Sequence, residues 1–401
     1  MKRDFVNMMI KGAGLWWYDM YGGWFNDPEI YRLIGVMSKE WERAAKEPVV
    51  NTAKIAFVVG DDLATAMAYD FDGSYDYLFQ ALYWQKESLA HIGAQFDLLY
   101  TSSFANGFMR DYDVYLIVAA NLTEQEIAGI NEKVKKDGKT VIWIGFPGIY
   151  GKDGSMSAEN VSSVTDIRLK FAPSGSSYGV KITADDGFAQ GINGYTYGKP
   201  SSVKVNPMLF VNDPEAASLG KIYGTELTGL AVKTVALAGG GSYTSVYSSV
   251  GNVPAAFIRN VLKNYGVNPV GAESGDAIYQ NGNYIAIASL YGGTKTITLD
   301  KPTFVYDVFA GKVLGENVSS VTVEMEAGTT LLIRTGEYLE PLEPDNPDNP
   351  DEPDNPDNPD DPVKPNKNVL GAGEIIAIAA AGTITVGSVV GGILLDKRKK
   401  R

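Results

Sequence analysis

"KIAFVVGDD", at residues 54–62, is the stretch that decides the fold. Its continuous apolar run ends in glycine, which is typical of a strand buried on both faces of a sheet. Helical spacing at 74–93 and a Thr-x-x-Glu capping box that opens a helix at 123–138 lie between further strands of this kind. Those strands are QFDLLYTSS at 95–103, YDVYLIVAA at 112–120 and TVIWIGFPG at 140–148. The alternation predicts an α/β domain with a parallel sheet and helices on both faces.

The second half of the chain changes character twice. Residues 149–250 are rich in Gly, Ser and Thr, with short strands such as VKITA, MLFVN and AVKTVAL, and a last helix follows at 253–267. The stretch DAIYQNGNYIAIASLYGGTKTITL then alternates apolar and polar residues around Asn-Gly and Gly-Gly pairs. Such turns indicate hairpins, so we expect a small antiparallel β domain at 271–338.

Composition excludes several classes of function. The net charge of −13 and the absence of a basic, aromatic-laced stripe argue against nucleic-acid binding. The chain has no cysteine and a single histidine, His91. We therefore expect no disulfide, no cysteine nucleophile and no metal site. No cofactor is expected either, because no G-x-G-x-x-G or Walker loop follows a strand, and the acids of VVGDDLATA would repel a phosphate.

The C-terminal region predicts a membrane anchor. Proline recurs at every third position from Pro341 to Pro365 among Asp, Glu and Asn, which favours an extended polyproline II stalk at 339–368. From Ile375 to Leu395 the chain carries no charge, and DKRKKR follows directly. A span of this length crosses a bilayer, and the basic cluster holds the C-terminus on the cytoplasmic side. We expect a single-pass anchor at 369–401 and an extracellular body.

An extracellular body requires export, and residues 1–30 have no apolar stretch long enough for an export signal. We therefore interpret the chain as the C-terminal portion of a longer protein. A mis-assigned start codon or a split gene would explain the same observation.

RDFVNMMIKGAGLWWYDMYGGWFNDPEIYRLI, at residues 3–34, and the α/β and β segments after it resemble the C-terminal half of family-42-type β-galactosidases. The resemblance covers about residues 1–338. It implies that 1–48 is the last strand and helix of a catalytic (β/α)8 barrel, with GLWWYD as the strand. Residues 49–270 would be a flavodoxin-like or class I glutamine-amidotransferase-like trimerisation domain, and the chain a homotrimer.

The same resemblance suggests a sugar site. Barrel active sites lie at the carboxyl ends of the strands, where Trp17, Asp19 and Trp24 would fall. An indole stacks against the apolar face of a sugar and a carboxylate holds its hydroxyls. Plain barrel packing remains open for the two tryptophans, and Asp19 would otherwise hold the following loop. Trp16 is expected to point outward, because neighbours in a strand alternate.

No catalytic residue is assigned. The two carboxylates of a retaining glycosidase come, by resemblance, from barrel strands that precede this chain. Among Glu29, Glu40, Glu42 and Glu47, none ends a strand. WIGFPGIY also lacks the cysteine of true amidotransferases. We therefore expect a membrane-anchored piece of a surface β-galactosidase-like hydrolase that binds a galactoside or another glycan, inactive by itself. The alternative is a non-catalytic surface carbohydrate-binding or scaffold protein.

Overall fold

The computed structural model describes residues 1–20, 22–70, 72–200, 203–267 and 275–337. Across these ranges, every helix is too short or too polar to traverse a lipid bilayer. The stalk expected at 339–368 and the anchor expected at 369–401, with its span from Ile375 to Leu395, lie outside the described residues.

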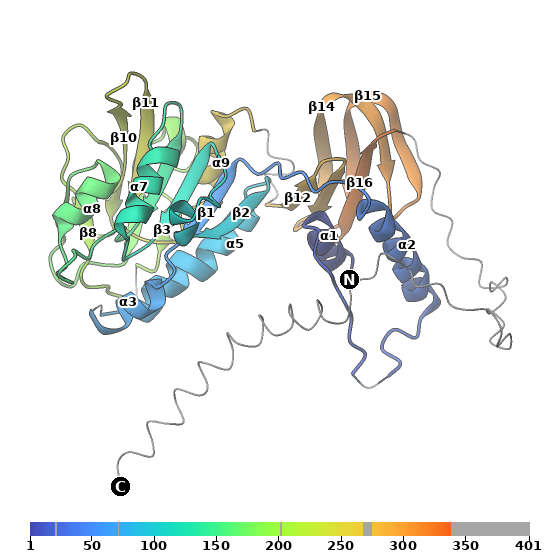
Figure 1. The fold of residues 1–401 in the computed structure, drawn as a ribbon, viewed down its shortest axis with the longest axis horizontal. Helices are drawn as coiled ribbons and strands as arrows, with labels where there is room; N and C mark the ends of the chain where they lie inside the picture. The colour runs from blue at the N-terminus through green and yellow to red at the C-terminus, as the bar shows by residue number, and fades with distance from the viewer. Residues whose placement is uncertain (21, 71, 201–202, 268–274, 338–401) are drawn as a thin grey trace, which may run out of the picture. The chain divides into compact units, whose positions relative to one another are not determined.

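The larger sheet confirms the predicted α/β class (Figure 1). Its main path runs β2-β1-β3-β4-β11-β10-β9-β6-β7, and β5 and β8 pair beside it. The first five strands of this path are parallel, and the others are antiparallel to their neighbours. The strands are β1 Ile55–Val59, β2 Phe96–Tyr100, β3 Val114–Val118, β4 Thr140–Ile144, β5 Leu169–Phe171, β6 Gly179–Ile182, β7 Thr196–Gly198, β8 Leu209–Val211, β9 Ala217–Ile222, β10 Thr228–Ala236 and β11 Ser242–Ser248.

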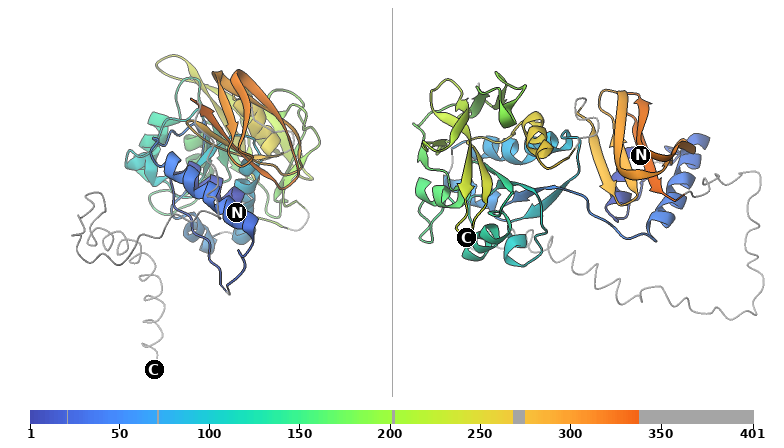
Figure 2. Two further views of the ribbon diagram at one scale, coloured as in Figure 1. Left: turned by 90° about the vertical axis from the view of Figure 1, so that its right-hand side faces the viewer. Right: turned by 90° about the horizontal axis from the view of Figure 1, so that it is seen from above.

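Helices cover both faces of this sheet (Figure 2). The chain steps from β1 to β2 in one direction along the sheet and from β3 to β4 in the other. Because crossovers between parallel strands are right-handed as a rule, the helices of these two connections are expected on opposite faces. The α5 helix contacts α9, and α6 contacts α7. The elements are α3 Leu63–Asp70, α4 Ser74–Leu78, the π-helix η1 Phe79–Trp84, α5 Gln85–Ala90, α6 Ser102–Ala105, α7 Glu124–Lys133, α8 Ala158–Thr165, the 3₁₀-helix η2 Gly187–Ala189 and α9 Ala255–Lys263.

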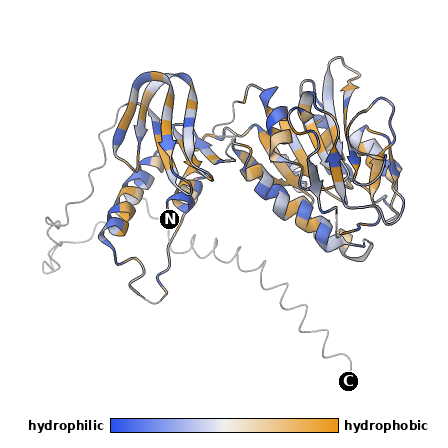
Figure 3. Cartoon of the chain, turned by 180° about the vertical axis from the view of Figure 1, so that it is seen from behind, coloured by the Kyte–Doolittle hydropathy of each residue, from blue (hydrophilic) through white to orange (hydrophobic). Residues whose placement is uncertain are grey.

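Two local signals account for much of this domain. The central strands β3 and β4 are buried along their whole length, as a continuous apolar run requires. The α7 helix begins with the predicted capping box, in which the Thr123 hydroxyl accepts the Glu126 N–H at 3.2 Å and the Glu126 carboxylate accepts the Thr123 N–H at 2.7 Å. Figure 3 shows hydrophobic residues gathered along the strands and mixed with hydrophilic ones on the helices.

The β domain is a five-stranded antiparallel sheet in the order β12-β13-β16-β14-β15. The strands are β12 Ala277–Asn281, β13 Tyr284–Ala288, β14 Gly293–Asp307, β15 Lys312–Met325 and β16 Thr330–Gly336. Gly282, with a φ of +49°, turns the first hairpin, as the Asn-Gly pair predicts. One face of the sheet buries a cluster of its own aliphatic side chains, which includes Ile287, Ile297 and Ile333.

The opposite face of this sheet holds the N-terminal helices, α1 Lys2–Ile10 and α2 Pro28–Ala44. They share one core with the strands, in which Phe5 and Met37 from the helices meet Tyr306 and Leu332. The ring of Phe5 lies edge-on to Trp41, with 5.5 Å between the ring centroids. Residues 1–48 therefore complete the β domain, a grouping that the sequence did not indicate.

The helix expected within residues 1–48 is present as α2, but the strand expected at 14–19 is not formed. A barrel strand exists through backbone hydrogen bonds to a strand on each side. In the described part of the chain, no segment pairs with residues 14–19, so their backbone has no regular secondary structure.

Candidate functional site: the tryptophan segment

The tryptophan segment, residues 14–25, joins α1 to α2. Gly12, at a φ of +66°, turns the chain out of α1. Asp27 caps α2 by accepting the N–H of Glu29 at 2.8 Å, and Pro28 occupies the first turn. Because both helices pack on the β domain, the ends of the segment are fixed.

Burial alternates along the segment in the manner of a strand, although no ladder forms. Leu15, Trp17 and Asp19 are half-buried, and the residues between them are exposed. Trp16 is 76% exposed and Tyr18 60% exposed, and their rings meet edge-on with centroids 5.8 Å apart. Trp16 therefore points away from Trp17, which leaves an outer row of aromatic side chains in contact with solvent.

Trp17 packs inward, against the core that α1 and α2 share with the β domain. Its indole Nε1 is buried and has no hydrogen-bond partner among the described residues. The contacts of Trp17 with this core favour a packing role over a sugar platform.

Asp19 acts on the turn that follows it. Its Oδ2 accepts the backbone N–H of Trp24 at 3.1 Å, while Oδ1 is buried without a partner in the described ranges. Gly22 and Gly23, both at positive φ, let the chain reverse at this point. The carboxylate thus fixes Trp24, whose side chain is 57% exposed. Trp17 and Trp24 do not form one platform, since Trp17 faces the core and Trp24 faces solvent.

The glutamates of α2 and of the residues just after it serve the helix and its contacts. Glu29 pairs with Arg32 at 3.0 Å, on the exposed side. Glu40 is fully buried and accepts the Tyr284 hydroxyl at 2.7 Å. Glu47 pairs with Arg334 of β16. Glu40 and Glu47 therefore join residues 1–48 to the β domain.

The turn after β4 has no room for a nucleophile. Gly145 has a φ of +70° at the end of a buried strand. An α/β enzyme presents its nucleophile on a strained turn of this kind. A Cβ at Gly145 would collide with the hydroxyl of Tyr77, and the hydroxyl of Tyr247 donates to the Gly145 carbonyl at 2.7 Å. Burial raises the pKa of both tyrosines, so they stay protonated and fill the space.

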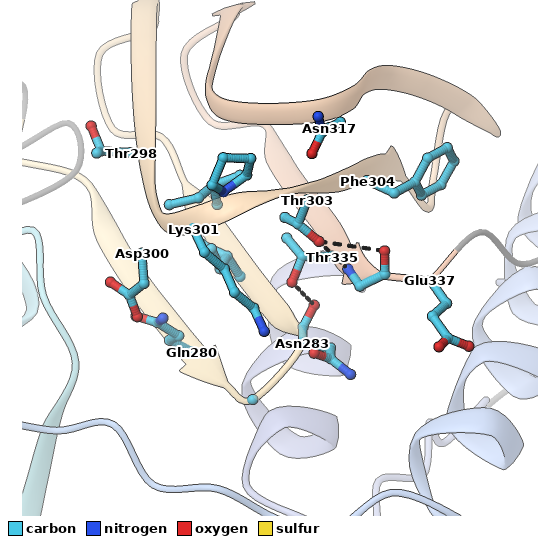
Figure 4. Close-up of a pocket in the computed structure, with 15 residues that line it drawn as sticks. Gln280, Asn283, Thr298, Asp300, Lys301, Thr303, Phe304, Asn317, Thr335 and Glu337 are labelled. Atoms are coloured by element: carbon cyan, nitrogen blue, oxygen red, sulfur yellow. Dashed lines mark hydrogen bonds between the residues drawn. The ribbon is translucent and has the colours of Figure 1, made fainter.

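A hollow of about 630 Å³ lies in the β domain, and none of the described residues of 14–25 lines it (Figure 4). The hollow lies at a bulge in β14, where residues 299–302 lie opposite a single residue of β15, Ser319. Lys301 extends from the bulge across the hollow. Across it, the Thr303 hydroxyl accepts the Gly336 N–H at 3.0 Å, and the Thr335 hydroxyl donates to the Asn283 carbonyl at 3.2 Å. These hydroxyls serve to join the strands.

No protein-family model and no curated protein matches the chain. Solved structures are similar to it. Gan42B, a GH42 β-galactosidase, aligns at 12% identity with a TM-score of 0.51, over 78% of this chain and 44% of Gan42B. A catalytic mutant of Gan42B from G. stearothermophilus gives a TM-score of 0.53 at 12% identity, over 77% and 44%. The β-galactosidase from Bacillus circulans sp. alkalophilus gives 0.47 at 14% identity, over 75% and 45%.

At these identities the likeness is one of fold. The chain spans less than half the length of the β-galactosidases it matches. It has a GH42-like fold over that share of their length.

Proposed function

We propose that this chain is a non-catalytic C-terminal portion of a glycoside hydrolase of the β-galactosidase type, which forms oligomers and presents the tryptophan segment to a glycan. The observation that carries the proposal is the alignment with Gan42B over 78% of this chain. The outer row of the tryptophan segment supports it, because an alternating segment without strand neighbours is what a lone barrel strand would leave.

The proposal requires a companion barrel that carries the two catalytic carboxylates. The test is an antibody against the α/β domain, applied to native extracts of the source cells. We expect it to detect a polypeptide larger than 43.2 kDa, or to co-precipitate a second chain, with hydrolysis of nitrophenyl β-galactoside in the precipitate. The 401-residue chain alone should show no turnover. A lone 43.2 kDa species without activity would contradict the proposal.

The alternative function is a surface carbohydrate-binding or scaffold protein. The exposure of Trp16, Tyr18 and Trp24 favours it, because solvent-exposed aromatic side chains can bind sugars without a catalytic barrel. On a glycan array, Trp24→Ala should weaken binding about tenfold, since one stacking contact is worth roughly 1.5 kcal/mol. Tyr31→Ala is the matched control, because Tyr31 is 58% exposed on α2, outside the segment. Equal binding by both variants would exclude the segment as the glycan site.

The membrane anchor and the extracellular orientation are part of the proposal. Their support is the uncharged span from Ile375 to Leu395 and the basic residues after it. Protease added to intact cells should remove the α/β and β domains and leave a short membrane-bound C-terminal fragment. If the protease leaves the whole chain intact, the proposed extracellular orientation is wrong. If carbonate washing releases the whole chain from the membrane, the proposed anchor is excluded.

Homotrimer formation, which the resemblance implies, is proposed for the α/β domain. Light scattering on the purified chain is the measurement, and a mass of three chains is expected. A monomer at all concentrations would contradict it.

A further inference from the structure

The order of the parallel strands creates a crevice in the α/β domain. The chain leaves β1 toward one face of the sheet and leaves β3 toward the other, although the two strands are neighbours. In open α/β sheets, ligands bind at such a switch point, outside the carboxyl ends of the strands. Asp61 and Asp62 follow β1 at this edge, and Asn121 follows shortly after β3.

A cleft of about 920 Å³ opens at this edge. Four segments line it: one after β1, one after β3, the glycine-rich loop between β4 and α8, and α8 itself. Leu122, Ile127 and Val164 give it an apolar side. Tyr150 closes one part of the wall, and its hydroxyl donates to the Ala66 carbonyl at 2.8 Å. The topological switch and the cleft therefore coincide.

The polar rim places hydrogen-bond donors beside acceptors. The Asn121 amide donates to Asp62 Oδ2 at 3.1 Å, and the Lys152 ammonium pairs with the Glu124 carboxylate. All four side chains line the cleft, and those of Lys152 and Glu124 are 85% and 75% exposed. Adjacent sugar hydroxyls each donate and accept, so they match such pairs. These four groups carry two carboxylates and one ammonium, a balance that disfavours phosphorylated ligands.

Asp61 has a different role at the same edge. Its carboxylate accepts the hydroxyls of Thr101 and Ser102, at 3.0 and 2.7 Å, and the Ser102 N–H at 2.9 Å. It thereby joins the end of β1 to the start of α6. With Asp61 engaged in this way and Gly145 blocked by Tyr77, the cleft can bind a ligand but offers no nucleophile after β4.

We infer that this cleft binds a small uncharged sugar non-covalently, with Asp62 and Asn121 holding one pair of hydroxyls and Glu124 and Lys152 another. The choice of galactose as the sugar rests on the proposed function. The site lies in the α/β domain and is separate from the tryptophan segment.

The test is to titrate the full chain with D-galactose and to measure binding by isothermal calorimetry and by saturation-transfer NMR. Asn121→Leu and Asp62→Ala should each weaken binding about tenfold, since each removes a hydrogen bond to the ligand. Both side chains are exposed, so both variants should fold, which circular dichroism checks. Asn193→Leu is the matched control, an exposed asparagine in a turn of the same domain. Galactose 6-phosphate should bind at least tenfold more weakly, because two carboxylates face it.

Three outcomes would overturn the inference. If galactose gives neither a binding heat nor a saturation-transfer signal, the chain does not bind this sugar and the inference fails. Wild-type affinity in both cleft variants excludes the site. Weakening by Trp24→Ala in place of the cleft variants assigns the sugar to the tryptophan segment, which removes the inference and leaves the proposed function standing. If the antibody experiment finds no companion barrel, the proposed function fails, but the inference that the cleft binds a sugar is not affected.

Discussion

Asp213 shows how one buried carboxylate organises the part of the α/β domain that the sequence described least. Its side chain is fully buried, and it accepts hydrogen bonds from the backbone N–H groups of Arg168 and Glu215, both at 3.1 Å. The ammonium of Lys233 lies 2.9 Å away and the guanidinium of Arg168 3.2 Å away. Burial alone would raise the pKa of Asp213, but these donors outweigh it and hold the pKa well below 3.8.

Asp213→Asn should lower the free energy of unfolding at pH 7 by about 2 kcal/mol, because the amide loses the charge-assisted hydrogen bonds. A carboxylate whose pKa is depressed in the folded state stabilises the fold above its unfolded pKa. That stabilisation is lost as the pH falls through the folded pKa. The gap between the variant and the wild type should therefore narrow below about pH 4 in urea unfolding. Asp111→Asn, at a carboxylate whose side chain is 71% exposed, should change stability little at either pH.

At the scale of elements, α2 is attached to the β domain by polar contacts as well as by its apolar face. Glu40 is buried between the Tyr284 hydroxyl and Arg43, and Arg334 stacks over the Tyr284 ring at 5.7 Å. Burial raises the pKa of Tyr284, and the neighbouring Glu40 carboxylate raises it further. The hydroxyl therefore stays protonated at neutral pH and remains a donor to Glu40.

Tyr284→Phe should cost about 2 kcal/mol of unfolding free energy, because Glu40 loses a donor in a site without water access. Amide exchange in α2 should accelerate with it, since the helix loses an anchor to β13. Tyr31→Phe, on the exposed side of the same helix, is the control and should leave both measurements unchanged. Unaltered exchange in the Tyr284 variant would show that apolar packing alone holds α2.

The elements that sequence predicts well are those whose signals are local. The runs that became β1 and β3 are apolar, β4 is apolar after Thr140, and the Thr123 capping box fixes the start of α7 by itself. The strand expected at 14–19 failed for the opposite reason. Its alternation is real, but a ladder needs neighbours, and a pattern in one segment carries no information about them. Sequence alone could not show whether the half-buried residues of that segment, such as Trp17, face a core or an active site.

At the scale of the whole molecule, the cores show which segments belong together. One core draws on residues between Ala53 and Leu262, and covers the α/β domain. Another combines helices α1 and α2 with the strands from Tyr284 onward. The α/β domain is thus inserted between two parts of the β domain, in sequence and in packing. Only long-range contacts determine this arrangement, so it could not be read from periodicity or turn signals.

Deletion of residues 1–48 should therefore damage the β domain and spare the α/β domain. The deletion uncovers Tyr306, Phe309, Leu332 and their neighbours, an apolar face that is covered in the intact chain. Calorimetry should retain the transition of residues 49–267 and lose or greatly lower a second transition, with new binding of a hydrophobic dye. Deletion of residues 345–401 is the control and should leave both transitions in place. Two normal transitions in the first variant would refute the shared core.

Because the α/β domain is inserted in the β domain, α1 and α2 are synthesised long before the strands that cover them. The α1 and α2 helices leave the ribosome about 290 residues before β16 is complete at Gly336. At elongation rates of roughly 5–20 residues per second, that interval lasts about 15–60 s. Throughout it, the apolar sides of both helices lack the strands that cover them, while the α/β domain between them can already fold. The nascent chain should therefore recruit a holding chaperone at α1 and α2 and release it only after β16 has emerged.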